Sequence, residues 1–106
     1  MRILIDECVP RRLLGLLADY NVATVPYMGW SGKKNGELLK LMIDEGFNIF
    51  ITVDQNLQYQ QNMKGAAIAI LVLYAETNSY DDLLALVPRI KEAIPIVKPS
   101  TVYVIK

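Results

Sequence analysis

Apolar runs and apolar repeats alternate along this chain of 106 residues. Short runs rich in branched aliphatic residues predict strands, and leucines three or four residues apart predict helices. The predicted strands cover Arg2–Ile5, Val22–Val25, Phe47–Val53, Ala66–Leu73 and Thr101–Ile105. Regular alternation of strands with helices predicts a mostly parallel sheet that carries helices on both faces.

The first predicted helix follows Pro10, because proline suits the first turn of a helix, where its missing N–H costs nothing. Asn21 is a plausible left-handed stop after this helix. Its apolar residues recur at helical spacing, at Leu13, Leu14, Leu17 and Tyr20.

Asn35 can cap the second predicted helix, Glu37 lies in its first turn, and Gly46 ends it. A short polar helix is predicted over Gln55–Met63.

The last helical region begins at Ser79. Asp82 follows three residues later, which resembles a capping box with aspartate in place of glutamate. Pro88 should kink or break this helix, because proline removes one backbone hydrogen bond.

These elements fit one domain over residues 1–106 with a three-layer α/β/α architecture of the Rossmann-like type. For five strands the common small solution is the order 2-1-3-4-5. In that order the chain reverses direction between strands 1 and 3, and ligands bind beyond the carboxyl ends of those strands.

Two aspartates follow those two strands. Asp6 comes after Arg2–Ile5, and Asp54 closes the run Ile49 to Asp54. Adjacent strands lie about 4.8 Å apart, so both carboxylates are expected at one crevice. Like charges so close disfavour ionisation unless a cation or a proton lies between them. This pair is therefore the strongest functional signal in the chain.

Each aspartate has a simpler explanation, because aspartate is a favoured residue at the start of a helix. Capping does not explain why Glu7 adjoins Asp6, nor why both aspartates meet at the reversal point. Glu37 can reach the same edge, although an acid in a first helical turn is also stabilised by the helix dipole alone.

Other polar residues near this edge are candidates for supporting roles. Thr52 either packs locally or orients a metal-bound water, and Asn56 can offer a neutral ligand. Lys33 and Lys34 can hold a phosphate, although a solvated pair in a loop is the commoner case. Trp30 can stack on a base, and the alternative is that it covers an edge of the core.

Tyr27 is a second aromatic candidate for base stacking. It lies with Trp30 in the loop from Pro26 to Lys34, which is rich in aromatic residues, glycine and lysine.

Composition narrows the chemistry further. The 11 basic and 11 acidic side chains cancel, so no global charge attracts nucleic acid or a membrane. Without histidine, His-based triads and HExxH zinc sites are excluded. The single cysteine, Cys8, adjoins the carboxylates, which disfavour a thiolate, so it is not expected to act as a nucleophile.

The longest apolar run is too short to cross a bilayer, and no signal peptide is recognisable. We therefore expect a soluble cytoplasmic protein. Its apolar content of 53% suggests a self-association patch and a homodimer.

The ordered motifs resemble a known family. Leu4-Ile5-Asp6-Glu7, Gly29-Trp30, Asn35-Gly36-Glu37-Leu38-Leu39 and Ile51-Thr52-Val53-Asp54 are similar to motifs of the small bacterial PIN-like proteins, distant relatives of VapC-type toxins. The resemblance covers nearly the whole chain.

It implies a PIN-like ribonuclease that binds Mg²⁺ or Mn²⁺ through Asp6, Glu37 and Asp54, acts on RNA and pairs with a small antitoxin. Family members usually carry acids where this chain has Asn35 and Asn56, which puts the strength of metal binding in doubt.

Two alternatives remain open. The chain can be a PIN-like module that binds a partner or RNA without catalysis, as the two asparagines suggest. It can also be a phosphoacceptor receiver domain, in which Asp54 accepts phosphate while Asp6 and Glu7 hold Mg²⁺. A receiver needs a lysine at the end of the last strand, and Lys106 is the sole candidate.

Overall fold

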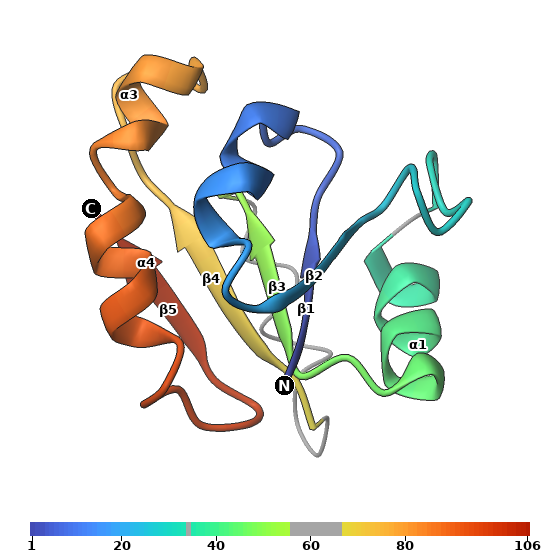
Figure 1. The fold of residues 1–106 in the computed structure, drawn as a ribbon. Helices are drawn as coiled ribbons and strands as arrows, with labels where there is room; N and C mark the ends of the chain where they lie inside the picture. The colour runs from blue at the N-terminus through green and yellow to red at the C-terminus, as the bar shows by residue number, and fades with distance from the viewer. Residues whose placement is uncertain (34, 56–66) are drawn as a thin grey trace.

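The computed structural model describes residues 1–33, 35–55 and 67–106. In these ranges, five strands form one sheet in the order β2-β1-β3-β4-β5, and every neighbouring pair is parallel (Figure 1). The strands are β1 (Arg2–Ile5), β2 (Asn21–Thr24), β3 (Ile49–Thr52), β4 (Ala69–Leu73) and β5 (Val102–Ile105). The predicted parallel sheet and strand order are confirmed.

Helices cover both faces of this sheet, which gives the three predicted layers (Figure 1). The α-helix α1 (Asn35–Glu45) packs on one face. The opposite face carries the 3₁₀ helix η1 (Arg11–Leu17) and the helices α3 (Tyr80–Leu84) and α4 (Val87–Ala93).

The central strands are buried on both faces, which explains why all their residues except Thr52 are apolar. Every residue of β3 and β4 is buried. Successive side chains point to opposite faces. Ile49 and Ile51 therefore join the core under η1 and α4, whereas Phe50 and Ile70 join the core under α1.

The first helix differs from an ordinary α-helix. Residues Arg11–Leu17 form a 3₁₀ helix, preceded by Pro10. Leucine pairs recur here every three residues, at 13–14 and 16–17, which matches the three-residue turn of a 3₁₀ helix. The predicted left-handed stop at Asn21 is wrong, because Asn21 is the first residue of β2.

The predicted break at Pro88 is confirmed. The helix α3 ends at Leu84, and Pro88 lies in the first turn of α4, where its missing N–H is harmless. At the start of α3, the Ser79 hydroxyl accepts from the Asp82 N–H at 3.3 Å. The Asp82 carboxylate accepts from the N–H and hydroxyl of Thr77, so the capping box is closed on one side only.

The predicted polar helix Gln55–Met63 lies outside the described residues from position 56 onward. None of the helices in the described part of the chain is long and apolar enough to cross a membrane.

Gly46 ends α1 as predicted, with a positive φ of 81°. We expect Gly46→Ala to destabilise the protein by about 1 kcal/mol, because a Cβ disfavours this left-handed backbone. Gly36→Ala is the matched control, since Gly36 lies inside α1 and an added Cβ there meets open space. This control should stabilise by up to about 1 kcal/mol. Urea denaturation measures the free energy of unfolding of both variants. Equal changes in the two would contradict a left-handed backbone at Gly46.

Candidate functional site

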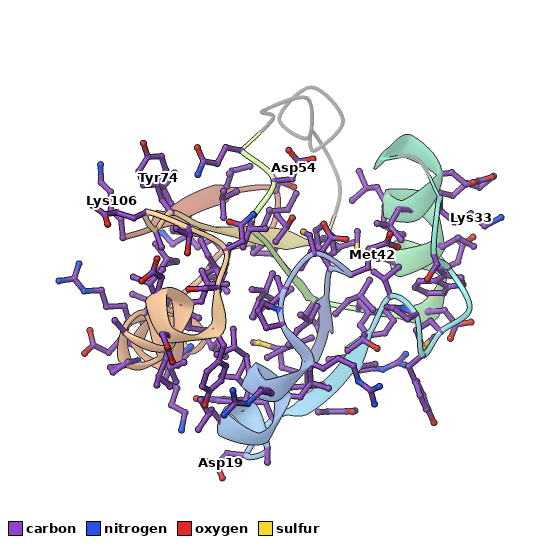
Figure 2. The ribbon with its side chains drawn as sticks, turned by 90° about the horizontal axis from the view of Figure 1, so that it is seen from above. Asp19, Lys33, Met42, Asp54, Tyr74 and Lys106 are labelled. Atoms are coloured by element: carbon purple, nitrogen blue, oxygen red, sulfur yellow. The ribbon has the colours of Figure 1, made fainter. Side chains whose placement is uncertain are left out.

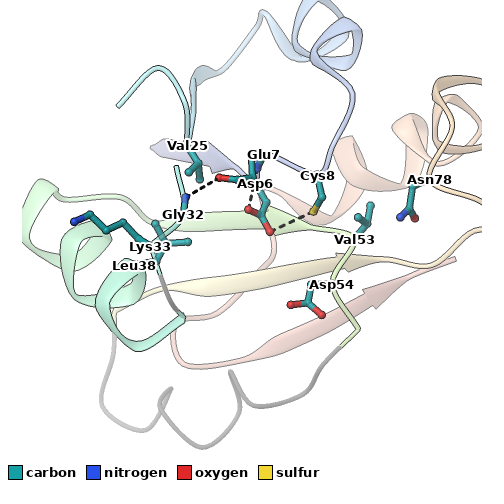
Figure 3. A pocket seen from close by; sticks show the side chains of 10 residues that line it. All are labelled: Asp6, Glu7, Cys8, Val25, Gly32, Lys33, Leu38, Val53, Asp54 and Asn78. Carbon is teal, nitrogen blue, oxygen red and sulfur yellow. Dashed lines mark hydrogen bonds between the residues drawn. The ribbon is translucent and has the colours of Figure 1, made fainter. Parts of the chain in front are cut away.

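The two aspartates lie at the carboxyl edge of the sheet. Ile5 pairs with Ile51, and the Asp6 N–H donates to the Ile51 carbonyl at 2.9 Å, so Asp6 extends β1 alongside Thr52. Asp54 lies two residues beyond the end of β3. Both aspartates line one cleft of about 400 Å³, the carboxylate cleft (Figure 3).

Thr52 connects the two aspartates. Its hydroxyl donates to Asp6 Oδ2 at 2.7 Å and accepts from the Asp54 backbone N–H at 3.0 Å. Thr52 is fully buried, with 0% of its surface exposed. Because a buried hydroxyl must keep its hydrogen bonds, these two contacts fix Asp6 against the turn that carries Asp54.

Two further donors face the Asp6 carboxylate. The Glu7 N–H donates to Oδ1 at 2.8 Å, and the Cys8 thiol donates to Oδ2 at 3.3 Å (Figure 3). Asp6 does not cap the following helix, since the residue before η1 is Pro10 and no side chain caps it. The capping explanation therefore fails for Asp6, whereas the residues after Gln55 that would test it for Asp54 are not described.

The surroundings of Cys8 raise the pKa of its thiol. Partial burial raises the pKa of this thiol, and the charge of Asp6 and the hydrogen bond to it raise it further, although contacts with Val53 and Thr52 act in the opposite direction. A raised pKa makes Cys8 a poor nucleophile near neutral pH, in agreement with the expectation from the sequence.

The rim of the carboxylate cleft is built from the loop before α1. The Gly32 N–H donates to Glu7 Oε2 at 3.3 Å (Figure 3). Lys33 also lines the cleft, and its Nζ lies 3.7 Å from Glu37 Oε1. Both side chains are largely exposed, so this ion pair contributes little to stability. Glu37 is in the first turn of α1 as predicted, but it is not among the residues that line the cleft.

The remaining candidates are placed differently. Asn35 is the first residue of α1, whereas Lys34 and Asn56 lie outside the described residues. Trp30 is partly buried and meets the Phe47 ring edge-on, with ring centroids 5.9 Å apart. This contact agrees with the alternative in which Trp30 covers an edge of the core.

Two polar side chains of the cleft, those of Asn78 and Cys8, have no site role in the sequence analysis. Asn78 lines the cleft from the loop after β4, and Cys8 contributes its thiol (Figure 3). The signal for Asn78 was available, because the carboxyl end of β4 lies at the same edge as those of β1 and β3. The hydrogen bond from the Cys8 thiol to Asp6 does not follow from the sequence, because it depends on the turn after β1.

The donors in this cleft suit a hard cation. Carboxylate oxygens of Asp6 and Asp54 and the amide oxygen of Asn78 are the ligand type that Mg²⁺ prefers. Asp6 already accepts three hydrogen bonds, which leaves room for one more contact, at Oδ1. Across residues 1–33, 35–55 and 67–106, no three His, Cys, Asp or Glu side chains form a metal-binding group. Water or substrate oxygens would have to complete the coordination.

The geometry of the last strand bears on the receiver alternative. β5 ends at Ile105, and the Lys106 carbonyl accepts from the Arg89 guanidinium. Lys106 does not line the cleft, and Figure 2 shows it well separated from Asp54. Among the residues that the structure describes, the cation that lines this cleft is Lys33 and not Lys106, which argues against the receiver alternative.

Comparison with known proteins found no matching family model, no matching curated protein and no matching solved structure.

We expect Thr52→Val to destabilise the protein by about 2–3 kcal/mol, because Asp6 Oδ2 and the Asp54 N–H each lose a partner in a buried setting. Thr52→Ser keeps the hydroxyl and removes one methyl group, so it should cost only about 1 kcal/mol. Chemical denaturation compares the two variants. Equal stabilities would show that the bridging hydroxyl contributes nothing.

Alkylation of Cys8 tests its raised pKa. In EDTA, the pH midpoint for reaction with iodoacetamide should be higher for the folded chain than for the urea-unfolded chain. Asp6→Asn should reduce this difference, because the charge is removed while burial remains. The raised pKa of the Cys8 thiol stabilises the folded chain at pH values below the thiol pKa of the unfolded chain. This stabilisation is lost as the pH rises through the thiol pKa of the folded chain. If the pH midpoint of alkylation in the folded chain is at or below that of the unfolded chain, the thiol pKa is not raised by folding.

Proposed function

We propose that this protein is a divalent-cation-dependent nuclease that hydrolyses RNA phosphodiesters. The supporting observation is that Asp6 and Asp54 line one cleft at the reversal point of a parallel sheet and are tied together through the buried Thr52. Ligand sites of such sheets lie beyond the carboxyl ends of the strands. Paired carboxylates at this position are suited to holding a cation against a phosphate group.

In this proposal Asp6 Oδ1 and the Asp54 carboxylate would hold Mg²⁺ or Mn²⁺, and Asn78 lines the same cleft. A bound divalent ion lowers the pKa of an attacking water and offsets charge that develops on the phosphate. Thr52, the Glu7 N–H and the Cys8 thiol keep the Asp6 carboxylate in one orientation.

Lys33, at the rim of the cleft, would offer positive charge to a backbone phosphate of the substrate. Its amine is paired with Glu37 of α1, which does not line the cleft. Because partial burial and Asp6 raise the pKa of the Cys8 thiol, it is a poor nucleophile near neutral pH, and water is the proposed nucleophile.

RNA is proposed as the substrate because of the resemblance to small PIN-like proteins. The same resemblance suggests the toxin of a toxin–antitoxin pair, with a small antitoxin as partner. A short adjacent reading frame that encodes a DNA-binding head and a hydrophobic tail would support this partner.

A second function is favoured by one observation. Glu37 faces Lys33 rather than the cleft, so the three-acid set that the resemblance implies is reduced to two acids and Glu7 at the rim. A PIN-like module that binds RNA or a partner without catalysis is consistent with this reduced set. Titration calorimetry separates the two, because a nuclease must bind Mg²⁺ or Mn²⁺ at millimolar concentration or below.

The nuclease proposal predicts cleavage of a single-stranded RNA oligonucleotide in Mg²⁺, with a DNA strand of the same sequence run in parallel. Asp6→Asn and Asp54→Asn should each reduce the rate by about a hundredfold or more, because each removes a cation ligand.

Asp44→Asn is the control, since Asp44 is an exposed acid on α1 outside the cleft. This variant should keep full activity. Cleavage that survives both cleft substitutions would identify a contaminant and remove the proposal.

A further inference from the structure

A second cavity runs along the outer edge of the sheet. Its volume is about 440 Å³, and all four residues of β2 line it together with side chains from η1 and from the loop after β2. We call it the β2 groove. It is separate from the carboxylate cleft, because the two cavities share no lining residue.

β2 is an outer strand, and its partner in the sheet is β1. The Val25 N–H donates to Ile5 on β1, and alternate residues of a strand direct their backbone groups to opposite sides. The N–H groups of Val22 and Thr24 and the Val22 carbonyl therefore point away from β1. Thr24 as a whole is largely buried, with 9% of its surface exposed. The Thr24 carbonyl is already satisfied by the Met28 N–H at 3.1 Å.

These three outward groups have no hydrogen-bond partner within the described ranges, and an unpaired strand edge of this kind is a template for another strand.

The side chains around this edge define the chemistry of an occupant. Leu14 and Met28 provide apolar walls, and both are partly buried. Arg11 is exposed and forms no ion pair or hydrogen bond with any residue that the structure describes. Tyr27 has 84% of its surface exposed. A groove of mixed polar and apolar lining, with an unpaired cation and an exposed tyrosine, suits a peptide that carries both apolar and acidic side chains.

Charge argues against a second copy of this chain as the occupant. The lining of the β2 groove contains Arg2 and Arg11 and no acid. Arg2 is partly compensated, because its guanidinium bonds the Glu45 carbonyl and lies 4.0 Å from the Glu45 carboxylate. A symmetric contact between two β2 grooves would still bring Arg11 of one copy toward the same cationic lining of the other. A heterologous acidic strand avoids this repulsion.

We propose that the β2 groove binds an extended segment of another polypeptide that adds as a strand to β2 and places a carboxylate side chain against Arg11. Backbone bonds to Val22 and Thr24 would supply affinity, and Arg11 with the apolar walls would supply specificity. This interaction needs neither a metal nor RNA, so it stands independently of the proposed nuclease activity.

Selection from a random display library of linear peptides on the immobilised full chain, in EDTA, tests the proposal. Recovered peptides should combine β-branched residues with at least one Asp or Glu. Arg11→Glu should weaken a recovered peptide by at least about tenfold, because the ion pair becomes a like-charge contact. Lys40→Glu is the matched charge reversal on α1, outside the β2 groove, and should leave binding unchanged.

Amide hydrogen exchange provides the second readout, with slower exchange expected at Val22 and Thr24 when the peptide is bound. The proposal is overturned if no peptide is recovered, or if recovered peptides bind the Arg11→Glu variant equally well. It is also overturned if a single-stranded RNA oligonucleotide, rather than a peptide, protects these two amides. Sedimentation could also detect self-association through β2 that Arg11→Glu does not affect. The occupant of the β2 groove would then be a second copy of this chain, and the proposal would be overturned.

Discussion

The candidate site depends on one buried hydroxyl. Thr52 is the last residue of β3, in the middle of the sheet, where no water is available to satisfy a polar group. Its hydrogen bonds to Asp6 Oδ2 and from the Asp54 N–H are therefore obligatory in the folded chain. They couple the end of β1 to the turn after β3. A valine would fill the same space but leave both partners without this bond.

This arrangement changes how the two acids are accommodated. Carboxylates at one crevice repel each other unless something offsets their charge. Here the Asp6 carboxylate faces a hydroxyl, a backbone N–H and a thiol, all of which donate to it. Neutral donors that already belong to the fold thus compensate part of the cost of placing Asp6 there. A cation at this cleft would add to an existing network and would not be required to assemble it.

The sequence predicted the fold better than the site. Apolar runs locate buried strands reliably, because strands covered on both faces consist almost entirely of apolar residues. Helix type was harder, since the leucine pairs that lead to Leu17 fit a 3₁₀ period as well as an α-helical one. The shared edge of Asp6 and Asp54 followed from strand order alone. The donors on Asp6 did not, because the contact between Cys8 and Asp6 depends on the local turn after β1.

One loop connects the two cavities. Val25 lines the carboxylate cleft, and Tyr27 and Met28, just beyond it, line the β2 groove. The same loop continues to Lys33 at the rim of the cleft. It is fixed at its start by Thr24, whose hydroxyl and carbonyl accept from the N–H groups of Tyr27 and Met28.

At the far end of this loop, Gly32 donates to Glu7. Tyr27 and Met28, which line the β2 groove, thus belong to the same loop as Lys33 at the rim of the carboxylate cleft. The β2 groove and the carboxylate cleft thus differ in the residues that line them, but one loop, anchored at both ends, joins them.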